Sequence, residues 1–135
     1  MKTWGIVLFL LHQTACSPCG ERVVTVGTLE VCAEVASTEA ARRQGLTSRS
    51  TLAEDEGLLL DFPFADEICI VNQGVGFAID AIYVDPTDRV TRVERSIDAG
   101  DARPRCQPDT QRVLEVAAGV AALVTTDDEL AVAAP

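Results

Sequence analysis

Two acidic residues lie inside apolar segments, where a carboxylate could do chemistry. Asp80 lies in the apolar segment 79–84, and Glu115 lies in a second one, 113–116. A buried charge is costly unless it is paired or hydrogen-bonded. The first interpretation of Asp80 is therefore structural, as an acceptor paired with Arg49, and the second is a general acid or cation ligand. Glu115 is likewise interpreted first as structural.

A short polar segment, Asn72-Gln73-Gly74, interrupts the apolar region 68–84. Its amides either line a small pocket between strands or form a plain loop. The candidate pocket residues are Arg49, Asn72, Gln73 and Asp80. The sequence assigns no catalytic residue, no metal and no cofactor. Its acidic turns lack the D-x-D-x-D-G-x₅-E spacing of a calcium loop.

The first nineteen residues have the pattern of an export signal. Lys2 precedes an apolar run at 4–11, small and polar residues follow, and Cys16 comes directly after Ala15. This order is typical of a secretory signal peptide, and the run is shorter than the roughly 20 apolar residues that cross a bilayer. The position of Cys16 resembles the lipobox of bacterial lipoproteins, which implies acylation of that cysteine. Ser17 would then mildly favour the outer membrane.

Other interpretations of this segment stay open. Ordinary cleavage near Ala15 would give a secreted protein without lipid, and an uncleaved segment is a further alternative. Cys16-Ser-Pro-Cys19 also has the C-x-x-C spacing of thiol-redox proteins. That motif belongs after a strand, at the start of a helix, rather than beside a signal sequence.

The composition of the chain after residue 15 excludes several kinds of chemistry. About 120 residues remain, enough for one domain with a core. This part contains no His and no Lys, which excludes Ser-His and Cys-His catalytic pairs, His-ligated zinc and Schiff bases. Without Lys2, ten Arg face 21 acidic residues, a net charge of −11. Nucleic acid is therefore an unfavourable partner.

Five cysteines remain in this part of the chain. If Cys16 carries lipid, the other four suit two disulfides in an oxidising compartment. Four cysteines allow three pairings, and we favour Cys19 with Cys32 and Cys69 with Cys106. Strand alternation puts Cys32 on the solvent face of segment 29–35, where a bonded cysteine is more common than a packed one. Four free buried thiols are the alternative.

Hydrophobic periodicity predicts a mainly β domain. Strands are expected at 22–26 and 29–35, followed by a short helix capped by Ser37 or Thr38 and ended by Gly45. Further strands are expected later in the chain, at 57–60, 68–84 with breaks, 89–95, 112–116 and 130–133. The turn 85–88 joins two of them in a hairpin with one solvent face, and 98–109 is expected to be a loop.

Four blocks of the chain, in order, resemble the DUF192 (UPF0127) family. They are A-R-R-Q-G-L-T-S-R at 41–49, E-D-E-G-L-L-L-D-F-P at 54–63, I-D-A-I-Y-V-D at 79–85 and V-L-E-V-A-A-G at 113–119. The resemblance covers most of the chain from Val31 onwards. It implies a compact, mostly β domain, often exported, with no established enzymatic activity. The family's F-W-M-K-N-T-like segment is replaced here by I-V-N-Q-G-V at 70–75.

These observations predict an α+β, mainly β, single compact domain, a β-sandwich or a partly open barrel, over residues 22–135. A signal peptide at 1–15 and a lipid-anchor tether at 16–21 precede it. The expected function is non-enzymatic binding of a small ligand or an unknown envelope protein, held at the bilayer through acylated Cys16. The alternatives are a hydrolase that uses Asp80 with a second carboxylate, and a secreted thiol-redox protein that uses Cys16 and Cys19.

Overall fold

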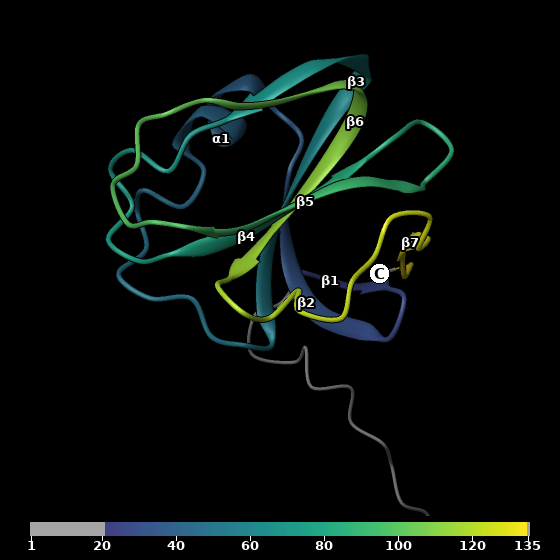
Figure 1. Cartoon of the computed structure of the whole chain (residues 1–135), viewed down its shortest axis with the longest axis horizontal. Coiled ribbons are helices and arrows are strands. Elements are labelled where there is room, and N and C mark those ends of the chain that lie inside the picture. Colours follow the sequence, from purple (N-terminus) through teal and green to yellow (C-terminus); the bar gives the residue numbers. More distant parts are fainter. Residues whose placement is uncertain (1–20, 135) are drawn as a thin grey trace, which may run out of the picture.

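The computed structural model describes residues 21–134 and is mainly β, with one short helix among these residues (Figure 1). The elements in chain order are β1 (Arg22–Val26), β2 (Leu29–Ala36), α1 (Glu39–Gln44), β3 (Glu56–Ile70), β4 (Ile79–Val84), β5 (Val90–Ile97), β6 (Arg105–Ala117) and β7 (Leu130–Val132). The predicted mainly β fold is therefore confirmed. The predicted signal peptide, tether, Cys16 and Cys19 lie outside the described residues.

All seven strands form one sheet in the order β5-β4-β6-β3-β2-β1-β7, which curls into a half-barrel. The β2–β3 pair is parallel and the other pairs are antiparallel. The two edge strands approach each other at one end, because Val90 donates its N–H to the carbonyl of Asp128 and Leu130 donates to that of Asp88. The expectation of a partly open barrel is close to this arrangement.

The curled sheet carries a separate apolar cluster on each face. One cluster combines β1 and β2 side chains with Leu59, Ile82 and Leu114. The other combines Tyr83 and Val113 with Leu46 and Leu52, which follow α1. Central strands are thus buried on both faces, and β4 has no exposed residue. An acidic residue on β4 or β6 must therefore be satisfied inside the protein.

The helix α1 begins and ends as the sequence predicts. The Thr38 side chain caps it by accepting a hydrogen bond from the N–H of Ala41 (3.1 Å). Gly45 ends it with a φ of 50°, a left-handed conformation that glycine adopts without strain. None of its residues is buried. The helix therefore rests on the surface beside the second cluster and can form the wall of a cavity.

Two segments expected outside strands lie within them. The second half of the predicted loop belongs to β6, which starts at Arg105 and pairs with the end of β3. Likewise β3 continues through Pro63 to Ile70, with register shifts between Asp61 and Ile68. The local signals of proline and charge are overridden here by pairing between the two long strands. Within residues 21–134, no helix is long and apolar enough to span a membrane.

Candidate functional site

A cavity of about 590 Å³ lies between α1, the middle of the sheet and the loop after β3. Its walls are largely apolar, formed by Leu46, Leu60, Phe62, Ile70 and Val75. Two buried polar side chains, those of Asn72 and Glu115, also line it. Its volume falls within the range of roughly 300–1,000 Å³ that is usual for small-molecule sites.

Glu115 brings a carboxyl group to this cavity from the centre of the sheet. It lies on β6 between Leu58 of β3 and Ala81 of β4, and it is 5% exposed. Within residues 21–134 it has no hydrogen-bond or ion-pair partner. Burial alone raises the pKa of Glu115 to about 7. The structural role predicted for Glu115 therefore lacks the contacts that would stabilise its charge.

Asn72, which also lines the cavity, carries an unsatisfied acceptor. Its side chain is 1% exposed, and its Nδ2 donates to the carbonyl oxygens of Phe77 (2.9 Å) and Asp98 (3.0 Å). Since both partners are acceptors, these bonds fix which end of the amide is the nitrogen. The Oδ1 atom is buried and accepts no hydrogen bond within the described part of the chain. Asn72 thus combines a fixed orientation with an unused acceptor.

The charged residues at the rim already have partners. Arg42 donates to the carbonyl oxygens of Ser37 (2.8 Å) and Asp61 (2.9 Å), and its guanidinium lies 4.9 Å from the centre of the Phe62 ring. Arg43 pairs with Glu39 at 2.7 Å on the exposed side of α1. Among residues 21–134, the rim therefore offers Glu115 no cation without a partner of its own.

The predicted pocket residues are split between two places. Asn72 and the exposed Gln73 line the cavity, whereas Arg49 and Asp80 do not. The structure does not bring Arg49 and Asp80 together, because Arg49 pairs with Glu34 (2.8 Å) and Glu56 (3.2 Å). The sequence favoured Arg49 because it is a cation in a family-like block, but strand order puts acidic β2 and β3 residues beside it.

Asp80 is satisfied by the backbone on the opposite face of the sheet. Its Oδ1 accepts from the N–H of Ser96 (2.8 Å), and its Oδ2 accepts from those of Gly119 (2.9 Å) and Ala121 (3.1 Å). A register shift in the β4–β5 pairing near Asp80, and positive φ angles at Ser96 and Gly119, accompany these bonds. With three donors, Asp80 has the structural role that the sequence favoured.

Elsewhere, a partly buried carboxylate has the cations that Glu115 lacks. Glu94 of β5 forms salt bridges with Arg92 (2.5 Å) and Arg105. Burial opposes ionisation of Glu94, but hydrogen bonds from both arginines outweigh it and hold its pKa below the usual value. Glu115 differs from Glu94 because it has no arginine partner among the described residues, and its pKa is raised rather than lowered.

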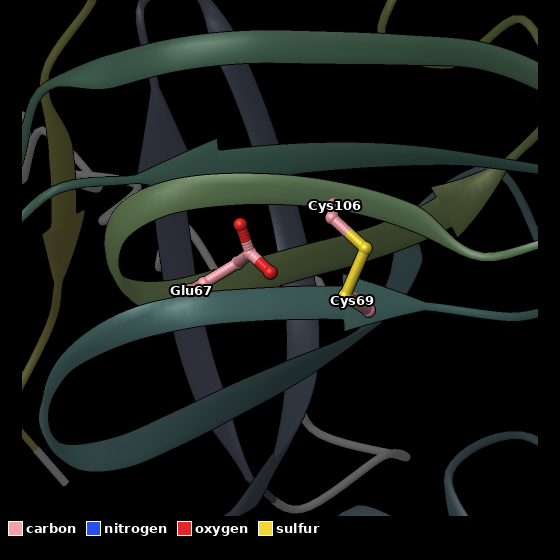
Figure 2. Close-up of side chains that lie close together, drawn as sticks. All are labelled: Glu67, Cys69 and Cys106. Atoms are coloured by element: carbon pink, nitrogen blue, oxygen red, sulfur yellow. A yellow bond between two sulfur atoms is a disulfide. The ribbon is translucent and has the colours of Figure 1, made fainter.

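The predicted disulfide between Cys69 and Cys106 is present in the structure. It joins directly opposed residues of β3 and β6, with Glu67 on the same side of the strand pair (Figure 2). One ligand atom from each of these three residues falls within a 4.8 Å group, the one candidate metal cluster found among residues 21–134. Both sulfurs are consumed by the disulfide, so the cluster is not a metal site in this state.

Cys32 is also disulfide-bonded, as the sequence predicts, and it shares its face of β2 with the exposed Glu30 and Glu34, but it is itself buried. It is 4% exposed. The preferred pairing with Cys19 lies outside the described residues.

Sequence reasoning identified Glu115 as unusual but did not place it in a pocket. The available signal was an acidic residue in a strand whose two faces are both apolar. The walls contributed by α1 and by Phe62 come from distant parts of the chain, so strand periodicity alone does not bring them together.

Comparison with known proteins identifies a family without an established activity. Two solved structures share the fold. A protein of unknown function from Novosphingobium aromaticivorans has a TM-score of 0.77 and 25% identity, covering 81% of this chain and 83% of its own. A putative transcription regulator from Sinorhizobium meliloti has a TM-score of 0.78 and 20% identity, covering 82% and 92%. No curated protein matches. The model of the DUF192 family, described as an uncharacterized ACR, matches residues 22–132, and the chain belongs to this family.

Proposed function

We propose that this chain is an exported, lipid-anchored, non-enzymatic domain of the cell envelope that binds a small ligand in the cavity beside Glu115. The observation that carries the proposal is that Glu115, a buried carboxyl group without a partner among the described residues, lines this cavity together with Asn72, whose buried Oδ1 is unused. Each unsatisfied buried polar group costs roughly 1–3 kcal/mol. A ligand with hydrogen-bond donors would recover part of this cost on binding.

The cavity supports binding better than catalysis. General acid-base chemistry of the hydrolase type needs a second carboxylate near the first. The other acidic residue lining this cavity is Glu39, which is exposed and paired with Arg43. Asp80, the acid of the hydrolase alternative, has its two oxygens occupied by three backbone donors and does not line the cavity.

Two features support the location in the envelope. The first 15 residues have the pattern of a signal peptide, followed by Cys16 for acylation. The cross-strand disulfide between Cys69 and Cys106 suits an oxidising compartment. The intact mass of the chain from the host's membrane fraction tests this part, with Cys16→Ala as the control. A diacyl or triacyl adduct that the control lacks supports the anchor, and a mass without lipid contradicts it.

A fragment screen by ligand-observed NMR tests the binding function. We expect hits that compete with one another and that are lost in Gln73→Trp, since the exposed Gln73 lines the cavity and an indole there would occupy it. Ser50→Trp is the matched control, because Ser50 is exposed and lies away from the cavity lining. Hits that survive Gln73→Trp, or the absence of any hit, would contradict a ligand site at this cavity.

A further inference from the structure

The two buried polar side chains that line the cavity offer acceptors once Glu115 is ionised. The Nδ2 of Asn72 is used by the carbonyls of Phe77 and Asp98, which leaves Oδ1 as the available atom. The carboxylate of Glu115, once ionised, also only accepts. A ligand that satisfies both groups must therefore present hydrogen-bond donors.

No cation within the described part of the chain compensates Glu115. From the strands on either side it faces Leu58 and Ala81, and the nearby Tyr83 hydroxyl donates instead to the carbonyl oxygen of Arg105 (2.5 Å). From α1, the cavity is bordered by Glu39, Arg42 and Arg43. These three are engaged as described above, two of them with each other. A positive charge that pairs with ionised Glu115 would therefore come from a ligand rather than from these residues.

The surroundings favour a cation with an apolar body. The walls around the two acceptors include Leu60, Phe62 and Val75, so a hydrocarbon part of the ligand would be removed from water there. The net charge of the whole chain is −10, which raises the local concentration of cations over anions.

We infer that the cavity takes a small organic ammonium, whose N–H groups bind the carboxylate of Glu115 while its apolar body contacts Leu60, Phe62 and Val75. The inference rests on the proposed ligand-binding function and names its ligand class. No bond is made or broken. When the ammonium binds, Glu115 gives its proton to solvent and the charge pair replaces a neutral acid.

This arrangement makes affinity depend on pH in a defined direction. Because burial raises the pKa of Glu115 to about 7, the carboxyl is mostly neutral at pH 6 and mostly ionised at pH 8. An ammonium binds the ionised form, so its affinity rises by about tenfold from pH 6 to pH 8. A neutral donor such as an alcohol has no such dependence.

Calorimetric titration of the processed full chain with three probes of one shape tests the inference: 2-phenylethylamine, 2-phenylethanol and 3-phenylpropionate. We expect the amine to bind at least tenfold more tightly than the other two at pH 8, and to weaken about tenfold at pH 6. Glu115→Gln should remove both the preference and the pH dependence. Glu30→Gln, a change of an exposed acid that does not line the cavity, should leave both intact.

The outcomes separate the inference from the function on which it rests. If the alcohol or the carboxylate binds as tightly as the amine, or if amine binding is unchanged in Glu115→Gln, the ligand class inferred here is wrong. The proposed ligand-binding function would not be contradicted by that result. Failure of all three probes, with no competing hit in the fragment screen, would overturn both. If Glu115→Gln does not fold, the pH dependence measured on the unaltered chain decides alone.

Discussion

Asp80 and Glu115 are two buried carboxyl groups on adjacent strands, yet the protein treats them in opposite ways. They lie at successive positions of the β4–β6 pairing, where Asp80 opposes Val116 and Glu115 opposes Ala81, and they face opposite sides of the sheet. Asp80 accepts three backbone hydrogen bonds, whereas Glu115 accepts none within the described residues and lines a cavity. The same residue chemistry thus stabilises the backbone on one face and has no partner among the described residues on the other.

The largest effect is expected at Asp80, whose carboxylate accepts three backbone hydrogen bonds. Asp80→Asn should destabilise the fold by about 3 kcal/mol or more, because an amide cannot accept at both ends and leaves at least one N–H facing another donor. The midpoint of chemical denaturation measures this change. Asp55→Asn, an exposed acid, is the control and should shift stability by less than about 0.5 kcal/mol. A loss of less than about 1 kcal/mol in Asp80→Asn would contradict a structural role for Asp80.

The second largest effect is expected at the disulfide that borders the cavity. Replacing Cys69 and Cys106 together with Ser should cost roughly 2–4 kcal/mol, since the disulfide closes a separation of 37 residues. Cys69 lines the cavity, so the loss should also weaken ligand binding. Denaturation of the double variant beside the unaltered chain, both without reducing agent so that the Cys32 disulfide is kept, gives the stability change. An insensitive midpoint would show that the strand pair holds this wall without the bond.

Glu115 should make stability depend on pH. Its folded-state pKa of about 7 is raised, so as pH increases the unfolded chain releases this proton first and the folded state loses stability. The loss should amount to about 2–3 kcal/mol between pH 5 and pH 9, levelling off above the folded pKa. Glu115→Gln should remove this decline in denaturation curves taken across that range. An unchanged decline would assign the dependence to another group.

The smallest effect tests the separation of Arg49 from Asp80. Arg49→Ala should cost less than about 1 kcal/mol, because its partners Glu34 and Glu56 are partly exposed. In a double-mutant cycle with Asp80→Asn, the coupling free energy should stay below about 0.5 kcal/mol. A larger coupling would mean that the two side chains interact after all.

Local patterns predicted the elements that local chemistry determines. Thr38 caps the start of α1 and Gly45 ends it, both through contacts within a few residues. The alternation of apolar and polar residues located β1, β2 and the β4–β5 hairpin. The partners of Asp80 were beyond such reasoning, because its donors come from an irregularity in β5 and a turn after β6. Local patterns could not predict the cavity either, because α1 and Glu115 are more than 70 positions apart and are brought together only by the strand order.

The ionisation of Glu115 tests the central claim most directly. Carboxyl ¹³C chemical shifts of the processed chain, assigned by comparison with Glu115→Gln and followed from pH 4 to pH 9, report the protonation of this side chain alone. The account predicts a midpoint near 7 that moves downward when 2-phenylethylamine is added. A midpoint near the ordinary value for glutamate, unaffected by the amine, would contradict it.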